Sequence, residues 1–248
     1  MHVDLEEVDS RVLGQAVLTL RNFDPAADFA AFEKEYVANH RPRYVACKVP
    51  VDQLRSIQAL EELGFRFVEV QIGGVAILRK QRDVSSYPYR FERVTTEKVL
   101  DGVLDIAGAS FDTDRFSNDS ELGAGFSGRR YREYVRKSFR ELDEAVYRLF
   151  DPADGKTLCF KTHKVLNNRE VYSLLTAARP DLKGSGLGML MDWYYDNQLL
   201  ADGITRIRTA ISAANPIMVR HLVSGGAMKV ETIQAVVRKL YPIAPRDG

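Results

Sequence analysis

The chain has 248 residues, of which 45% are hydrophobic and 28% are charged, an ordinary balance for a globular protein that buries a sizeable core. Its formal net charge of +1 gives no overall attraction to nucleic acid or to an anionic membrane, so we expect neither as a partner. The two cysteines, Cys47 and Cys159, are too few for a disulfide framework or a zinc site, which predicts no metal and a reducing, cytoplasmic location. No apolar run reaches the roughly 18 residues of a membrane-spanning helix.

Residues 1–84 predict a small N-terminal α/β domain. The apolar runs 16–21 and 44–50 are typical of strands, and residues 51–64 carry apolar side chains at helical spacing up to a glycine, which is common at helix ends. A strand-like stretch then runs to residue 80. The polar segment after it contains a proline and indicates a linker, so we place the domain boundary between residues 84 and 85.

Residues 85–248 predict a second, larger domain. The expected elements are, in chain order, a strand at 89–94, helices at 95–111 and 128–142, strands at 145–151, 156–166 and 170–178, a helix ending near 201, a strand at 205–212, a short helix from 215 and a last strand at 230–240. Such an alternation predicts an α+β fold with a mixed, mostly antiparallel sheet flanked by helices. The apolar last strand fits either the interior of this sheet or the interface of a homodimer.

The segment "RPDLKGSGLGMLM", residues 179–191, places three glycines in five positions at the start of a helix. Each glycine costs about 1 kcal/mol against alanine inside a helix, so the segment indicates a need for bare backbone, either for close packing or for an anion at the helix N-terminus. The nucleoside triphosphate loop does not fit, because Lys183 precedes the glycines instead of following them. The dinucleotide pattern G-x-G-x-x-G is not matched either.

The basic residue followed by G-x-G-x-G resembles the coenzyme A pyrophosphate loop of the acetyl-CoA-dependent N-acetyltransferase (GNAT) superfamily. "LLTAARPDLKGSGLG" resembles the central strand of that family, with its bulge, proline and loop in order. "ANPIMVRHLVSGGAMKV" resembles the family's segment of asparagine, short helix and glycine. The resemblance covers residues 88–242 and implies a GNAT fold with acetyl-CoA as the co-substrate.

Three further segments are similar to the dTDP-fucosamine acetyltransferase family, which acetylates the amine of a nucleotide-linked amino-deoxysugar. They are "YVACKVPVDQLRSIQALEELGFRFVEVQI", "DTDRF" and "RRYREYV". This resemblance implies direct attack of a primary amine on the thioester, for surface polysaccharide biosynthesis. Another small amine or a protein N-terminus stays open as the acceptor, and so does a non-catalytic acyl-CoA-binding module.

The superfamily resemblance implies positions for the coenzyme on this chain. The family's central strand splays from its neighbour and pairs with the pantetheine, which places Ala177 and Ala178 along it and lets one backbone N–H face the thioester oxygen. Asn215 opens the short helix further along and is expected near the coenzyme. The pyrophosphate loop would be formed by Lys183, Gly184, Ser185, Gly186, Leu187 and Gly188.

Two residues are considered for proton transfer on the strands. Glu170, at the start of the central strand, lies at a similar distance before the loop as the glutamate that lysine-acetylating members use as general base. A plain surface glutamate fits this position equally well. His163 has a suitable ordinary pKa for proton transfer, but a lone histidine among strand residues also fits a structural role.

The general acid departs from the family pattern. Many members place a tyrosine seven residues after the asparagine that opens the short helix, and here that position is Leu222, which carries no proton to donate. The neighbouring His221 is the expected substitute, with protonation by water or a loss of catalysis as the alternatives. Tyr194 and Tyr195, on the preceding helix, fit either this role or the core.

The acceptor is expected near "DTDRF" and the helix that follows it. Aromatic faces suit a nucleobase or a sugar ring, and an arginine binds a diphosphate through two parallel hydrogen bonds. The candidate residues are Asp114, Arg115, Phe116, Tyr131 and Tyr134. The two tyrosines lie three residues apart on a helix and therefore also fit a pair that faces the core.

Overall fold

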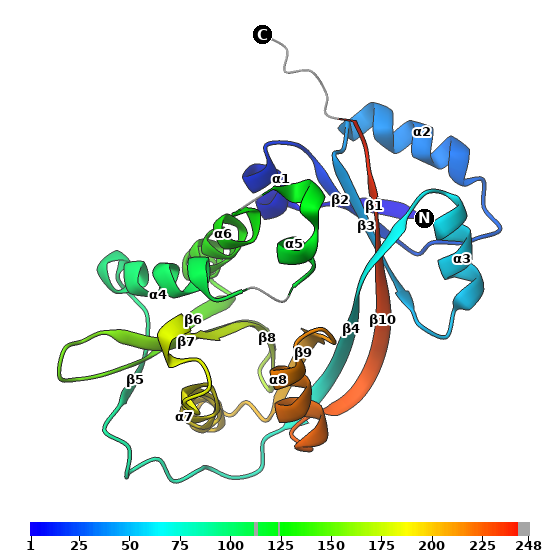
Figure 1. Cartoon of the computed structure of the whole chain (residues 1–248). Helices are drawn as coiled ribbons and strands as arrows, with labels where there is room; N and C mark the ends of the chain where they lie inside the picture. Colours follow the sequence, from blue (N-terminus) through cyan, green and yellow to red (C-terminus); the bar gives the residue numbers. More distant parts are fainter. Residues whose placement is uncertain (112–113, 124, 243–248) are drawn as a thin grey trace.

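The computed structural model describes residues 1–111, 114–123 and 125–242 (Figure 1). Asp112 and Thr113, the first two residues of "DTDRF", lie outside the described residues, as do positions 243–248 of the predicted second domain. The strands are β1 (His2–Leu5), β2 (Val17–Arg21), β3 (Tyr44–Pro50), β4 (Arg66–Ile77), β5 (Arg90–Arg93), β6 (Glu144–Phe150), β7 (Thr157–Asn167), β8 (Glu170–Ala178), β9 (Arg206–Ser212) and β10 (Lys229–Leu240).

The described strands form one ten-stranded sheet in the order β1-β2-β3-β10-β4-β9-β8-β7-β6-β5. Only the pairs β2–β3 and β8–β9 are parallel, and the other neighbouring pairs of the described residues are antiparallel. The helices are α1 (Glu7–Leu13), α2 (Phe29–His40), α3 (Leu54–Glu62), α4 (Glu97–Ala109), α5 (Arg115–Asn118), α6 (Phe126–Arg140), α7 (Leu187–Ala201) and α8 (Pro216–Met218). A mixed, mostly antiparallel sheet flanked by helices confirms the predicted α+β class.

Strand β6 shows how the sheet separates two cores. Ala145, Tyr147 and Leu149 belong to the apolar cluster that packs on α7, whereas Val146 belongs to the cluster that packs on α4 and α6. Because successive side chains of a strand point to opposite faces, α7 covers one face of this part of the sheet and α4 and α6 cover the other. Figure 1 shows α4 and α6 above these strands and α7 below them.

Helix α7 follows directly from its sequence pattern. Its buried residues recur at helical spacing along one side and pack into the core; they are Leu187, Leu190, Met191, Tyr195 and Leu199. The helix runs for 15 residues and is preceded by the glycine segment. The long apolar contact therefore fixes the direction in which the glycine-rich N-terminus points.

The predicted N-terminal domain has an apolar core of its own. Helices α2 and α3 pack on β2 and β3 through a cluster that contains Leu18, Leu20, Phe29, Tyr36, Val45, Cys47, Val49, Leu60, Phe65 and Val237. The last of these residues lies on β10, near the end of the chain. The core of the first segment is therefore completed by a strand from the second.

Strands from the two predicted domains alternate in one sheet and so join the domains. Strand β4, from the first segment, lies between β9 and β10 of the second and pairs with both. Strand β10 in turn pairs with β3 through its other edge, from Gln234 opposite Pro50 to Leu240 opposite Tyr44. Both edges of β10 are thus paired within the chain. The strand therefore has no free edge with which to pair across a homodimer interface. The division at residue 84 stays a prediction.

Among the residues described, no helix has both the length and the apolar character that a membrane-spanning segment requires. The same residues contain no group of three or more histidine, cysteine, aspartate or glutamate side chains placed to hold a metal ion.

Candidate functional site

Strands β8 and β9 are paired only at their beginning. Their parallel ladder runs from Glu170 opposite Arg206 to Tyr172 opposite Arg208 and then stops. Strand β8 continues to Ala178 along β7, and β9 continues along β4, so the two strands diverge beyond this point. The divergence leaves an opening in the middle of the sheet, where the ladder between β8 and β9 is not continued; the Thr209 hydroxyl donates to the Ser173 carbonyl at 3.2 Å at its edge.

A β-bulge lies where the opening begins. On β7, Thr162 is opposite Leu175 and His163 is opposite Ser173, so Leu174 between them has no opposite residue. The N–H of Leu175 is taken up by Thr162 Oγ1 at 3.1 Å. Bulges redirect the backbone and often occur beside functional sites. The bulge implied by the superfamily resemblance is therefore present, and it lies at the apex of the opening.

The glycine segment forms an open turn between β8 and α7. Gly184 and Gly186 have φ angles of +86° and +85°, in the left-handed region that favours glycine, and a Cβ atom at either would meet nothing within 4 Å. The close-packing explanation of the glycines is therefore wrong. Gly186 is the N-cap of α7 and has no side chain with which to cap it, so the first helical turn keeps N–H groups without a helical partner, although the Leu187 N–H lies 3.4 Å from Ser185 Oγ. Such a turn is suited to bind an anion.

A cavity of about 490 Å³ occupies the opening between β8 and β9. Its wall includes residues 173–176 of β8, and Ala177 and Ala178 then connect this wall to the glycine turn. Other parts of its wall come from α7 and from the segment 215–222. One continuous stretch of chain thus lines the cavity, leaves the sheet and enters the helix N-terminus.

Charged side chains gather on the α7 side of the cavity. Lys161 Nζ donates to Asp192 Oδ1 at 2.5 Å, and His221 Nε2 lies 3.0 Å from Asp192 Oδ2. Burial alone would raise the pKa of Asp192, but the charge of Lys161 and the hydrogen bonds from both partners outweigh it and lower that pKa. The hydrogen bond to Asp192 raises the pKa of His221, against the opposing effect of burial.

No protein-family model matches the sequence, and no curated protein matches it. Among solved structures, a GCN5-related N-acetyltransferase from Sphaerobacter thermophilus is similar with a TM-score of 0.68 at 10% identity, over 96% of this chain and 76% of that chain. One from Kribbella flavida gives 0.59 at 13% identity, over 90% and 81%. A tandem GNAT protein from the clavulanic acid biosynthesis pathway gives 0.59 at 12%, over 92% and 76%. The chain has the GNAT fold.

At these identities the likeness establishes the fold alone, and the activity must be argued from the site. Within the GNAT fold of this chain, His221 and Leu222 both line the cavity, as does Asn215, whose side chain accepts a hydrogen bond from the Met218 N–H at 3.1 Å and caps α8. The residues 219–224 form a turn of π-helix. His221 is thus available on the cavity wall at the point where the sequence lacks the family's tyrosine.

The residues expected on the acceptor side are divided by the structure. Asp114 and Tyr131 line the cavity together with Phe111, whose ring stacks on that of Tyr131 at a centroid distance of 3.9 Å. Arg115 and Phe116 are not among the lining residues, and Phe116 is buried. The Nε and Nη1 atoms of Arg115 are buried without a hydrogen-bond partner in the described part of the chain.

Tyr134 also lies away from the cavity. Its ring contacts the Arg130 guanidinium at 4.4 Å. Burial raises the pKa of its hydroxyl to about 12, so it stays protonated. Tyr134 therefore belongs to the packing of α6, whereas Tyr131 faces both the core and the cavity.

The proton-transfer residues expected on the strands are engaged elsewhere. Glu170 is ion-paired with Arg206 at 3.3 Å and with Arg208 at 2.8 Å, and it does not line the cavity. His163 is 3% exposed, its Nδ1 lies 2.7 Å from the Tyr195 hydroxyl, and burial lowers its pKa to about 4. The neutral imidazole is thus a structural part of the core.

Neither tyrosine of α7 reaches the cavity. The hydroxyl of Tyr194 donates to the backbone carbonyls of Val84 and Tyr89 at 3.3 and 3.1 Å, which ties the linker to the helix. The hydroxyl of Tyr195 is occupied by His163. Of the protein groups named from the sequence as general acids, His221 is the one that the structure brings to the cavity.

Sequence reasoning missed three of the charged residues in the cavity. Lys161 lies on β7, and Asp192 and Asp196 lie one turn apart on α7. The two aspartates are the only charged residues of α7 and lie four residues apart, which was a signal that both face one surface. Nothing in the sequence places Lys161 opposite them, because that contact depends on how α7 crosses the sheet.

Asp196 provides a test of this electrostatic arrangement through stability. Burial raises its pKa to about 6, although Lys161 opposes the shift. An aspartate with a higher pKa in the folded state makes folding less favourable once it ionises, so its cost appears as the pH rises from about 4 to 6. We expect Asp196→Asn to raise the free energy of unfolding at pH 8 by about 1–3 kcal/mol, since one pKa unit corresponds to about 1.4 kcal/mol.

Urea unfolding of both proteins between pH 4 and pH 8 measures this difference. The gain should shrink to about 0.5 kcal/mol or less at pH 4, where the carboxyl is protonated in the folded chain and about half protonated in the unfolded chain. Asp52→Asn, at an exposed position, is the control and should change stability by less than about 0.5 kcal/mol at every pH. A gain for Asp196→Asn that does not depend on pH would contradict the assignment.

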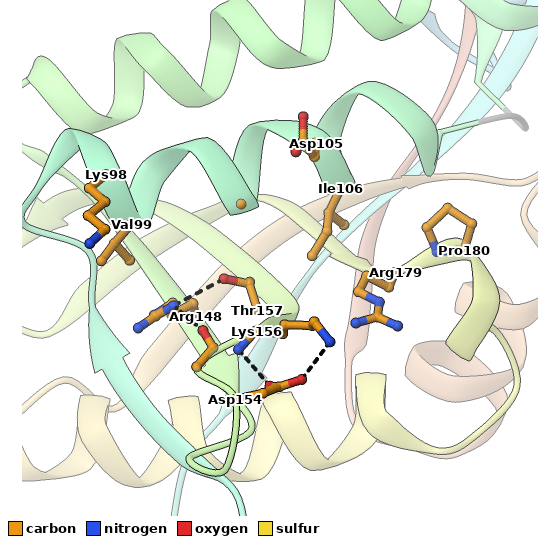
Figure 2. Close-up of a pocket in the computed structure, with 12 residues that line it drawn as sticks. Lys98, Val99, Asp105, Ile106, Arg148, Asp154, Lys156, Thr157, Arg179 and Pro180 are labelled. Atoms are coloured by element: carbon orange, nitrogen blue, oxygen red, sulfur yellow. Dashed lines mark hydrogen bonds and ion pairs between the residues drawn. The ribbon is translucent and has the colours of Figure 1, made fainter.

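A second hollow of about 730 Å³ lies between α4 and the turn that joins β6 to β7. Figure 2 shows the side chains that line it. Three of its four cationic side chains already form ion pairs: Arg148 with Glu92, Lys156 with Asp154 and Arg179 with Asp181. It is a wider and shallower surface feature than the cavity between β8 and β9, and it holds none of the residues expected to act in proton transfer. We therefore place the candidate site in the cavity.

Proposed function

We propose that this chain is an N-acyltransferase that moves an acetyl group from acetyl-CoA to a primary amine by direct attack, without a covalent enzyme intermediate. The observation that carries the proposal is the continuity of the stretch 173–188. It diverges from β9, forms a wall of the cavity and ends in the uncapped glycine N-terminus of a long helix. A donor with an extended arm and a diphosphate needs these features in this order.

The residues along this stretch fit coenzyme A. The diverging edge of β8 offers backbone groups to an extended pantetheine in place of the missing partner strand. In the turn, the N–H groups of Lys183, Ser185 and Leu187 donate to Pro180 O, Leu182 O and Ser185 Oγ. The N–H groups of the three glycines are therefore the ones proposed to bind a pyrophosphate, with open space at Gly184 and Gly186 for its approach. When bound, acetyl-CoA supplies an acyl group that is activated as a thioester. The backbone at the bulge, around Leu174, is the proposed hydrogen-bond donor to the thioester oxygen.

Proton transfer is assigned to His221. It lines the cavity, it is partly exposed, and its Nε2 is held 3.0 Å from the ionised carboxylate of Asp192, which leaves Nδ1 for the exchange of a proton. Leu222, at the position of the family's tyrosine, contributes only apolar wall. Positioning of the two substrates in one cavity supplies the larger part of the catalysis, and a general acid typically adds a factor of about 10² to 10⁴.

The acceptor proposed is a small primary amine. The residues that line the acceptor side are Phe111, Tyr131 and Asp114, an aromatic wall with one carboxylate. Arg115, Phe116 and Tyr134, on which recognition of a nucleotide diphosphate would depend, are not among the residues that line this cavity. A nucleotide-linked amino sugar therefore remains one member of the acceptor class, and another small amine fits the cavity equally well.

The test is the release of thiol from acetyl-CoA in the presence of a panel of amines that includes amino-sugar nucleotides. We expect release with at least one amine. Gly186→Glu is expected to abolish it, because a carboxylate would stand where the diphosphate binds. Coenzyme binding itself is measured by isothermal titration with acetyl-CoA.

Gly203→Glu is the matched control. Gly203 lies just beyond the other end of α7, with a φ of +80° and no neighbour within 4 Å of an added Cβ. The two substitutions therefore carry the same backbone strain and the same charge, and only the first lies at the helix N-terminus. Equal loss of acetyl-CoA binding in both would contradict the loop assignment. Binding without release across the whole panel would favour a non-catalytic acyl-CoA-binding module.

A further inference from the structure

Three side chains that lie far apart in the sequence form one hydrogen-bonded chain on the wall of the cavity. Asp192 is at its centre, with Oδ1 on Lys161 Nζ and Oδ2 on His221 Nε2. Lys161 and Asp192 are 9% and 17% exposed, whereas His221 is 32% exposed. The exposure increases toward the histidine, so the chain is anchored in the protein and ends at the cavity.

The contact with Asp192 determines which nitrogen of His221 is free to react. An ionised carboxylate only accepts hydrogen bonds, so Nε2 must carry a hydrogen in this contact. The proton that the imidazole exchanges with a substrate is then the one on Nδ1. Fixing one ring nitrogen with a carboxylate in order to present the other is a common way to set the tautomer of a reactive histidine.

Lys161 gives the carboxylate a fixed place. Without the lysine, the Asp192 carboxylate would be free to rotate together with the histidine ring. With the lysine, one carboxylate oxygen is bound to Lys161 of β7 and the other contacts His221. The charged groups that face His221 are Asp192 and Asp196 from α7 and Lys161 from β7. The two aspartates favour the protonated histidine, and the lysine disfavours it.

We propose that Asp192 and Lys161 are positioning residues of the reaction: Asp192 holds His221 with Nδ1 toward the cavity and favours its protonated form, and Lys161 fixes Asp192. This proposal rests on the proposed acyl transfer. In that reaction the C–N bond forms and the C–S bond breaks. The proton on Nδ1 passes to the leaving sulfur, and the amine nitrogen gives one proton to the neutral Nδ1, so His221 ends the turnover in its starting state.

The arrangement has a signature that a merely structural ion pair would not show. Removing the charge of Asp192 lowers the pKa of His221, because that aspartate is its main stabilising partner. Removing the charge of Lys161 raises the pKa of His221, because the repulsion of a nearby cation is lost. Substitutions of Asp192 and of Lys161 should therefore shift the pKa of His221 in opposite directions.

The experiment is an NMR titration of the histidine rings in the full-length chain. The sequence has four histidines, so the signal of His221 is identified by its loss in His221→Gln. We expect the wild-type ring to titrate above the ordinary value of about 6.5, Asp192→Asn to lower that pKa and Lys161→Met to raise it. A wild-type ring that titrates at or below 6.5, or shifts of the same sign in both variants, would overturn the proposal.

The rate profile is the second readout. Asp192→Asn should lower kcat by about 10- to 100-fold and move its alkaline limb to lower pH, with little change in the KM for acetyl-CoA. Asp143→Asn is the matched control, because Asp143 pairs with another lysine of β7, Lys164, at 3.0 Å on the exposed surface. It should leave both the ring titration and the rate unchanged.

The two readouts separate this proposal from the proposed function. Thiol release together with an unshifted His221 in both variants would overturn the positioning role alone. No release with any amine, together with the expected opposite shifts, would overturn the acyl transfer and leave the geometry of His221 intact. If Asp192→Asn does not fold, the wild-type titration and Lys161→Met still decide the matter.

Discussion

A fragment of residues 85–248 is expected not to fold on its own. Strand β4, which lies outside this fragment, is the only described strand that pairs with β9 beyond Arg208, and it is one of the two partners of β10. The other partner of β10 is β3, which is also missing. The fragment would expose three unpaired strand edges and part of the core on α7, a state that favours aggregation. Circular dichroism and size-exclusion chromatography measure the outcome.

The matched control is the full chain cut within the linker. A protease site inserted near residue 85 breaks the chain at the same place but keeps β4 in the sheet. We expect the nicked protein to elute as one species with an unchanged spectrum, because the exchanged strands hold the two pieces together. A longer fragment, 64–248, restores β4 and should recover part of the structure. Cooperative unfolding of 85–248 alone would instead support an independent second domain.

The part of the site that could be predicted from sequence is the part encoded locally. The strand that ends at Ala178, the glycine turn and the helix that begins at Leu187 follow one another in the chain, and each has its own signal in side-chain period or glycine punctuation. The left-handed φ angles of Gly184 and Gly186 are the physical reason why the turn needed glycine. The α+β class was predictable from a different local signal, the alternation of strand-like and helix-like segments along the chain.

The rest depends on contacts that sequence spacing does not encode. The place of β4 between β9 and β10 joins residues more than a hundred positions apart, and an alternating apolar pattern is the same whichever strand is the neighbour. From sequence alone, Glu170 fitted a general base and a surface glutamate equally well. The structure shows it in an ion pair with Arg208 of the adjacent strand. Lys161, Asp192 and His221 meet only because α7 crosses β7 at one particular angle.

Replacing Asp9 by leucine is expected to lower the free energy of unfolding by about 3–5 kcal/mol, because it would leave the charge of Arg130 buried without its partner. Arg130 Nε lies 2.7 Å from Asp9 Oδ1, and the two side chains are 12% and 3% exposed. The pair joins α1 to α6 and therefore links the two predicted domains on the face opposite α7. Urea unfolding at pH 7 measures the loss.

Two comparisons make this prediction specific. Asp105→Leu is the matched control. Asp105, on α4, pairs at 2.8 Å with Arg132, which like Arg130 lies on α6, but Asp105 is 76% exposed, so its loss should cost about 0–1 kcal/mol. The double variant Asp9→Leu/Arg130→Met should recover most of the stability lost by Asp9→Leu, because replacing both members of a buried ion pair with apolar side chains removes the unpaired charge. Equal losses at Asp9 and Asp105 would mean that Arg130 is solvated in the folded protein. In that case, burial of this pair would not be what holds α1 against α6.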